Sequence, residues 1–152
     1  ATEGKVMWEG GFLGGNAEGF DIHGLEILDN SGKVSSTIEH SQDFEISMEW
    51  SNASAMNHIV LYKLMTPGGR VVIQAKYELK GTGKPASEMH KLICNANSNI
   101  APPGLYQLSV EIYQEDQKVI NLDRILSLAF SDENLALSNE SGDLINLNWR
   151  VE

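Results

Sequence analysis

The side chains that most often carry out catalysis are present in this sequence, but not at the spacings that catalysis requires. Its four histidines occur singly, without the His-x-His or His-Glu-x-x-His pairs that hold a metal ion. None of its serines lies in the Gly-x-Ser-x-Gly turn of a hydrolase nucleophile, and no phosphate-binding Walker A motif occurs. The sequence therefore predicts no catalytic residue, no metal site and no cofactor.

Polar side chains on the outward side of strands favour a different chemistry, the recognition of sugars. A sugar offers a C–H face that stacks on an aromatic ring, and hydroxyl groups that need donors and acceptors. In residues 71–77 and 105–113, apolar positions alternate with polar ones, so that the polar ones point outward together. The candidate carbohydrate-binding residues are Arg70, Gln74, Lys76, Ser109, Glu111 and Tyr113.

The charge of this candidate site favours an anionic group, and its assembly depends on one condition. Arg70 and Lys76 would supply the positive charge that an acidic sugar or a phosphate needs. The residues of the first run share a site with those of the second only if both strands lie in one sheet. The sequence does not show whether they do.

The elements that carry these side chains are expected to be strands. Phe44, Ile46, Met48 and Trp50 alternate with polar residues, which is typical of a half-buried strand. Clusters of turn-forming residues separate such runs, and no helical periodicity is found. The sequence predicts an all-β fold, an antiparallel β-sandwich of immunoglobulin-like or jelly-roll topology. The expected strands cover residues 20–28, 44–50, 59–65, 71–77, 88–94, 105–113, 119–122, 125–130 and 144–151.

Composition and charge narrow the class of partner. The chain has 152 residues and a formal net charge of −10, which repels nucleic-acid backbones and anionic membrane surfaces. We therefore expect no nucleic-acid partner. Cys94 is the only cysteine, so no disulfide can form within the chain, which favours a reducing compartment.

The chain divides into two unequal parts by composition. Residues 1–19 contain six glycines together with Trp8 and Phe12, and we interpret them as a linker or an arm leading into the domain. Residues 20–152 carry all the strand-like runs and are expected to form the β-sandwich domain that binds carbohydrate.

Several motifs occur in an order that resembles a known family. The sequence is similar to the C-terminal carbohydrate-binding domain of the ATP-binding subunit, of Wzt type, of O-antigen polysaccharide ABC exporters. The residues that carry the resemblance are the strand and turn at 20–32 (FDIHGLEILDNSG), the strand at 43–48 (DFEISM), the segment 102–110 (PPGLYQLSV), the segments 128–130 (LAF) and 142–144 (GDL), and Trp149 near the end.

The resemblance implies a β-sandwich that forms a homodimer and recognises the non-reducing end of a finished lipopolysaccharide O-antigen glycan. It implies nucleotide-binding and transmembrane subunits of an ABC exporter as partners, and a cytoplasmic location, peripheral to the inner membrane through the transporter. The family's binding residues vary with the glycan, so the candidate residues above rest on strand alternation alone.

Other functions remain compatible with the sequence. A β-sandwich of this composition could be the carbohydrate-binding module of a secreted glycosidase, or a structural or adhesion domain without a small ligand. An enzyme is a further alternative, for which the sequence offers no motif. A signal peptide in the parent gene would favour the first two of these alternatives, whereas an upstream Walker A domain would indicate the exporter.

Overall fold

A computed structural model describes residues 2–7, 19–52, 56–81, 86–131 and 142–152. A 3-10 helix, η1 (Ser98–Ile100), precedes the ninth strand. The strands in chain order are β1 (Thr2–Glu3), β2 (Lys5–Met7), β3 (Phe20–Leu28), β4 (Thr37–Glu39), β5 (Asp43–Asn52), β6 (His58–Met65), β7 (Val71–Leu79), β8 (Ala86–Asn97), β9 (Gly104–Gln114), β10 (Gln117–Ser131), β11 (Asp143–Leu144) and β12 (Asn148–Val151).

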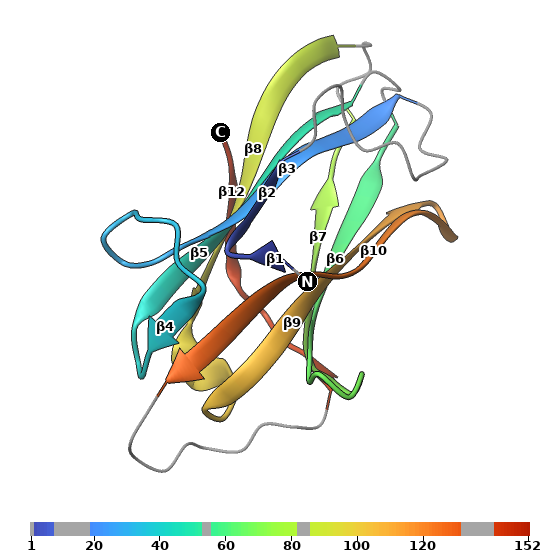
Figure 1. Ribbon diagram of the computed structural model, residues 1–152. Coiled ribbons are helices and arrows are strands. Elements are labelled where there is room, and N and C mark those ends of the chain that lie inside the picture. Colours follow the sequence, from blue (N-terminus) through green and yellow to red (C-terminus); the bar gives the residue numbers. More distant parts are fainter. Residues whose placement is uncertain (1, 8–18, 53–55, 82–85, 132–141) are drawn as a thin grey trace.

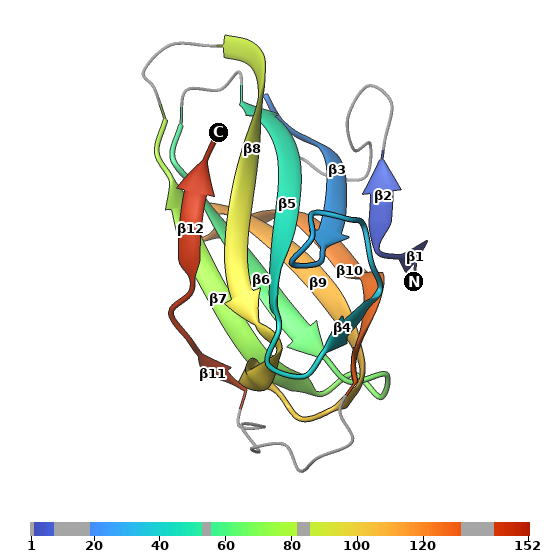
Figure 2. The ribbon, with the colours of Figure 1, turned by 90° about the vertical axis from the view of Figure 1, so that its left-hand side faces the viewer.

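These strands form two sheets that face each other, as Figures 1 and 2 show. The seven-stranded sheet has the order β1-β10-β9-β6-β7-β11, with β4 also paired to β10, and the five-stranded sheet has the order β12-β8-β5-β3-β2. The expected all-β sandwich is confirmed. The long strands pair antiparallel, whereas the short strands β1, β4 and β11 join the seven-stranded sheet in parallel.

The core lies between the sheets and consists of the residues that alternate inward. On β5, Phe44, Ile46, Met48 and Trp50 are all buried, as their alternation predicts. On β9 the inward positions from Tyr106 to Ile112 are buried in the same way. Burial of each large side chain stabilises the fold by about 1.5–3 kcal/mol. The alternation of apolar residues therefore determines which face of each sheet packs in the core.

A bulge joins two of the expected strands into one. The sequence predicts separate strands at 119–122 and 125–130, but β10 runs through both, with a shift of register between Leu122 and Leu126. Arg124 lies in the bulge with a φ of 49°, a left-handed conformation that is uncommon for residues other than glycine. Its N–H donates to the Ser109 Oγ at 2.7 Å, which supplies the hydrogen bond that the ladder lacks here.

The first residues of the chain form two short strands, although the sequence predicts a linker or an arm there. Residues 2–7 contain β1 and β2, and these strands pair with β10 and β3 at the edges of different sheets. Between them the Gly4 carbonyl accepts from the Ile27 N–H at 2.7 Å. The prediction of a linker is therefore wrong for residues 2–7, because edge pairing depends on distant strands and not on local glycine content. Residues 8–18, with Trp8 and Phe12, lie outside the described residues.

The C-terminal residues contact both sheets. The sequence predicts one strand over 144–151, but β11 pairs with β7 of the seven-stranded sheet and β12 pairs with β8 of the five-stranded sheet. Figure 2 shows this segment passing along the edge of the sandwich from one layer to the other. The Trp149 ring packs on Tyr62 and Tyr77, with ring centroids 5.2 Å and 5.4 Å apart.

Candidate functional site

The two groups of predicted site residues lie on the outer face of one sheet. Strand β6 lies between β7 and β9 in the seven-stranded sheet, with Leu61 opposite both Lys76 and Glu111. In the next row Lys63 lies opposite both Gln74 and Ser109. The condition that the sequence left open is thus satisfied: the two runs share a sheet and a register.

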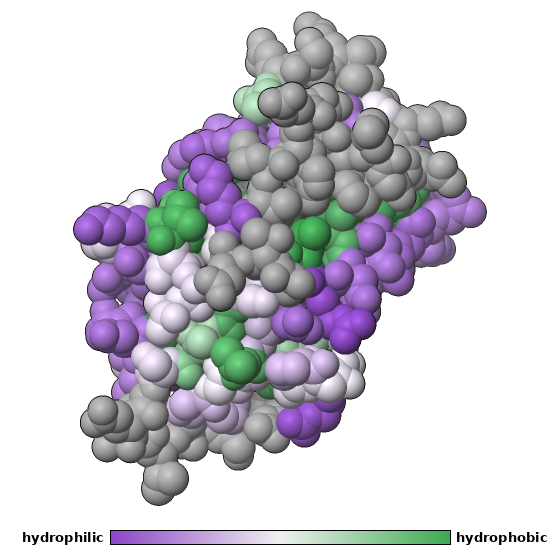
Figure 3. Space-filling model, in the orientation of Figure 1, coloured by the Kyte–Doolittle hydropathy of each residue, from purple (hydrophilic) through white to green (hydrophobic). Residues whose placement is uncertain are grey.

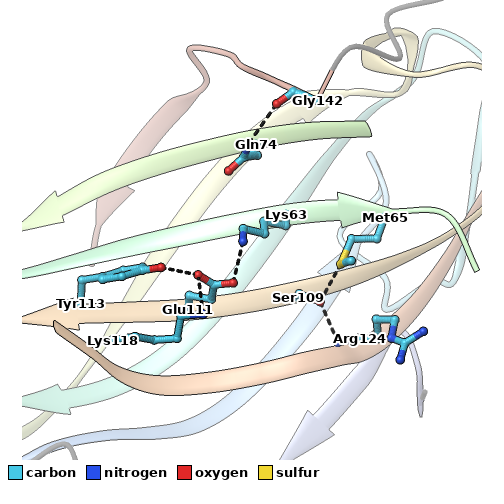
Figure 4. A network of polar contacts seen from close by, with 9 residues as sticks. All are labelled: Lys63, Met65, Gln74, Ser109, Glu111, Tyr113, Lys118, Arg124 and Gly142. Carbon is cyan, nitrogen blue, oxygen red and sulfur yellow. Dashed lines mark hydrogen bonds and ion pairs between the residues drawn. The ribbon is translucent and has the colours of Figure 1, made fainter. Parts of the chain in front are cut away.

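A carboxylate lies at the centre of this face, as Figure 4 shows. Glu111 is only 5% exposed. Its oxygens are 2.8 Å from the Lys63 Nζ and 3.3 Å from the Lys118 Nζ, and the Tyr113 hydroxyl donates to Oε1 at 2.6 Å. We call the surface around Lys63, Lys76, Glu111, Tyr113 and Lys118 the lysine face.

The contacts within the lysine face change how its groups titrate. Burial raises the pKa of Glu111, but the hydrogen bonds from Lys63 and Tyr113 and the charges of Lys63 and Lys118 outweigh burial and lower it overall. The hydrogen bond to Glu111 and partial burial raise the pKa of Tyr113 to about 12. At neutral pH, Glu111 is therefore ionised and Tyr113 carries its proton.

Besides Tyr113, whose hydroxyl donates to Glu111, three of the predicted residues have side-chain contacts within the protein. Ser109 is 2% exposed, because the β10 bulge covers it. Its hydroxyl accepts from the Arg124 N–H and donates to the Met65 Sδ at 3.2 Å. The Gln74 side chain donates to the Gly142 carbonyl at 3.0 Å. Ser109 and Glu111 therefore point outward, as predicted, but both side chains are buried by other parts of the protein.

The remaining predicted residues differ in their position. Lys76 is exposed and Tyr113 is partly exposed, and strand geometry places their Cα atoms about 12 Å apart across β6. Arg70 precedes β7 in the turn after β6, about 20 Å from Lys76 along the strand. The structure thus brings Lys76 and Tyr113 onto one surface but does not bring Arg70 to them.

Lys63 and Lys118 are the residues of this face that sequence reasoning missed. On β6, Lys63 points to the same side as Ile59 and Leu61. Because these two residues are apolar, the sequence does not show that this side of the strand is the outer one. Lys118 is the second residue of β10 and lies opposite Tyr113 of β9, next to the turn between the two strands. Both lysines reach Glu111 diagonally, because Lys63 lies opposite Ser109 and Lys118 lies opposite Tyr113. This register cannot be read from the sequence.

The lysine face differs in charge from the rest of the molecule. Its outer rows contain Lys63, Lys76 and Lys118 against Glu78 and Glu111, so it has one net positive charge in a chain of net charge −10. A cavity of about 410 Å³ opens at its end, lined in part by Ile59 and Glu78, which lie in the same row as Tyr113. The hairpin joining β9 and β10, beside this end, is hydrophilic in Figure 3.

The part of the chain that the structure describes offers neither a metal site nor a membrane-spanning helix. Within it, no group of three or more His, Cys, Asp or Glu side chains is placed to hold a metal ion. Among the same residues, no helix has the length and apolar character needed to cross a membrane. Cys94 is buried, and burial raises the pKa of its thiol to about 12.

Comparison with solved structures shows a likeness of fold. No family model and no curated protein matches this sequence. Among solved structures, the crystal structure of the C-terminal domain of Wzt superposes with a TM-score of 0.59 and 9% sequence identity, over 85% of this chain and 83% of that chain. The chain therefore has the fold of the C-terminal domain of Wzt, as the resemblance in its sequence indicated.

Proposed function

We propose that this domain is a carbohydrate-binding module that holds a polysaccharide on the lysine face. The single observation that carries the proposal is the arrangement of Lys76 and Tyr113 on one exposed sheet surface around an ion-paired Glu111. The ring offers a surface for a C–H face, and the ammonium groups offer donors. The fold shared with the C-terminal domain of Wzt supports this proposal.

The charge of the face favours a glycan that carries an anionic group. Lys63 and Lys118 both contact Glu111, which neutralises only one of them. Lys76 has no ion pair among the described residues. A uronic acid or phosphate lying over Lys76 would therefore meet an ammonium group that has no ion pair among the described residues. The ion pairs with Glu111 keep the Lys63 and Lys118 stems in place before the ligand arrives, which lowers the ordering cost of binding.

Titration calorimetry with the cognate polysaccharide tests the site. Lys76→Ala is expected to weaken binding at least about 30-fold and to leave the melting temperature unchanged, because Lys76 is exposed. Lys91→Ala, which removes an exposed lysine from the outer face of the five-stranded sheet, is the matched control. Equal affinity in the Lys76 and Lys91 variants would remove the lysine face from the binding site.

The finer proposal is recognition of the non-reducing end of an O-antigen, linked to export. In this proposal the domain works as a homodimer on the cytoplasmic side, joined to the nucleotide-binding and transmembrane subunits of an ABC exporter, and does not itself catalyse a reaction. Polysaccharide trimmed at its non-reducing end should then lose binding, and sedimentation should give the dimer mass. Equal binding of trimmed chains would favour a glycosidase module instead, and no binding of any glycan would favour a structural role.

A further inference from the structure

A groove of about 440 Å³ lies at one end of the five-stranded sheet, away from the lysine face. Its lining residues come from the end of β8, from η1 and from the segment between β11 and β12, and Figure 2 shows the course of these segments. Its volume is within the range of roughly 300–1,000 Å³ for small-molecule sites. We call it the asparagine groove, after the polar residues that line it: Asp43, Asn95, Asn97, Asn146 and Asn148.

Two Asn-x-Asn sequences place the amides on one wall. Alternate residues of a strand point to the same side, so Asn95 and Asn97 of β8 point outward together. Asn148 begins β12 and lies opposite Asn95 in register, and Asn146, two residues before this strand, also lines the groove. Ile100 and Leu147 add apolar surface between the amides. Hydrogen-bonding groups around an apolar patch match a sugar ring, which has hydroxyls at its edge and C–H bonds on its face.

The hydrogen bonds within the groove leave specific groups available. The Asn97 side chain is fully used, since it donates to Asp43 Oδ1 at 2.9 Å and to the Ser41 carbonyl, and accepts from the Asn99 N–H. Asp43 therefore keeps one oxygen for a ligand. Within the described residues, no hydrogen bond is found to the side chains of Asn146 and Asn148, which are exposed.

The two available amides are held in place by their backbone. The Ile145 N–H donates to the Gln74 carbonyl at 2.8 Å, which attaches the residue before Asn146 to the seven-stranded sheet. Asn148 is paired with β8 in the five-stranded sheet, and the apolar Leu147 between them packs against the core. Amides fixed by neighbours on both sides lose little backbone freedom on binding, which favours affinity.

The charge around the groove selects against anions. A second cavity of about 340 Å³ shares Asp43 and Asn95 with the groove and adds Asp29 and Glu45. Arg150 pairs with Glu45 at 3.2 Å and with Glu152 at 2.9 Å. The carboxylates thus outnumber the cation along this extended surface, the reverse of the lysine face. An acidic sugar would be repelled here, whereas a neutral one would not.

We propose that the asparagine groove is a second binding site, for a neutral saccharide, with the Asn146 and Asn148 amides and the second oxygen of Asp43 binding its hydroxyls. The site is separate from the lysine face and does not depend on the function proposed for that face. A polysaccharide with an anionic end and neutral repeating units could bind both surfaces. Its anionic end would lie on the lysine face, and a neutral unit would lie in the asparagine groove.

Nuclear magnetic resonance titration of the labelled domain with mannotriose, maltotriose and cellotriose tests the groove, with trigalacturonate as the anionic counterpart. At least one neutral trisaccharide is expected to shift the side-chain amide signals of Asn146 and Asn148. The double variant Asn146→Ala/Asn148→Ala should weaken that binding at least tenfold and keep the melting temperature, because neither side-chain amide has a hydrogen-bond partner among the described residues. Gln117→Ala, which removes an exposed amide from the β9–β10 hairpin, is the matched control.

The outcomes separate this proposal from the preceding one. Neutral binding that survives the double variant, or that is absent for all three trisaccharides, overturns the asparagine groove as a saccharide site. Tighter binding of trigalacturonate than of the neutral sugars at Asn146 and Asn148 overturns its stated selectivity. Lys76→Ala should leave the binding of neutral trisaccharides unchanged. If the lysine face is not a binding site, this will be seen only in the calorimetric titration of Lys76→Ala with the polysaccharide.

Discussion

At the residue scale, Glu111 shows how a side chain predicted to contact a ligand serves the protein itself. It points to the outer face of the sheet, yet Lys63, Tyr113 and Lys118 cover and neutralise it. Removing a partner from a buried charge costs more than an exposed ion pair contributes. The carboxylate therefore positions the lysines and the tyrosine ring, while Lys76 and Tyr113 remain for a ligand.

Glu111→Gln is expected to lower the free energy of unfolding by about 1.5–3 kcal/mol at neutral pH, because it removes the charge from these hydrogen bonds. The pKa of Glu111 is lowered in the folded state, so its stabilisation is present above the ordinary glutamate pKa of about 4.3 and is lost as pH falls through the lower folded pKa. Urea melts of both proteins from pH 7 to pH 3 check this. A difference that does not shrink with acid would contradict it.

Ser109 also has a structural role at the residue scale. Ser109→Ala should cost about 1–3 kcal/mol, since it leaves the N–H of Arg124 without its acceptor in the β10 bulge. Ser127→Ala is the control, because no hydrogen bond of its hydroxyl is found among the described residues. Denaturant melts give the cost, and hydrogen exchange at the Arg124 amide should become faster. Equal stability in the two variants would mean that the bulge does not need Ser109.

At the element scale, β9 shows that burial within one strand follows alternation. Leu108 is 1% exposed and lies in the core, whereas Leu105 on the opposite side is 67% exposed. The β9 strand also pairs with β6 and β10 over most of its length. It therefore supports both the core and the lysine face.

Leu108→Ala is expected to destabilise the domain by about 2–5 kcal/mol, through lost burial and a cavity in the core. Leu105→Ala removes the same atoms from the exposed side of the same strand and should change stability by less than about 0.5 kcal/mol. Chemical denaturation monitored by tryptophan fluorescence measures both. Reversed magnitudes would show that the faces of β9 are exchanged.

At the scale of the whole molecule, the C-terminal segment links the two sheets. Its strands β11 and β12 cover the edges formed by β7 and β8, where unpaired backbone groups would otherwise invite association. Trp149 lies against Tyr62 and Tyr77 of the opposite sheet. This segment thus closes one side of the sandwich and forms part of the asparagine groove.

Trp149→Ala should lower the free energy of unfolding by about 2–4 kcal/mol, because it removes a partly buried aromatic ring that bridges both sheets. Val151→Ala, on the same strand and 46% exposed, is the control and should have little effect. Thermal melts followed by circular dichroism provide the comparison. A loss below 1 kcal/mol for the tryptophan variant would show that the sandwich closes without it.

The sequence by itself determined the fold class, the inward side of the main strands and the exposure of Lys76. These properties depend on period-two alternation, which residues 44–50 and 71–77 display locally. The resemblance to the Wzt domain also came from the order of short segments, and the shared fold confirms it. The alternation along residues 144–151 was equally readable, but not the division of this segment between β11 in one sheet and β12 in the other.

The tertiary structure alone decided what covers each outward side chain. Glu111 is buried because Lys63 and Lys118 come from neighbouring strands, and Ser109 is buried because β10 bulges over it. The two Asn-x-Asn pairs meet because β12 pairs with β8. Alternation specifies the direction of a side chain, whereas its partners depend on the pairing and register of strands distant in the sequence, which no local pattern encodes.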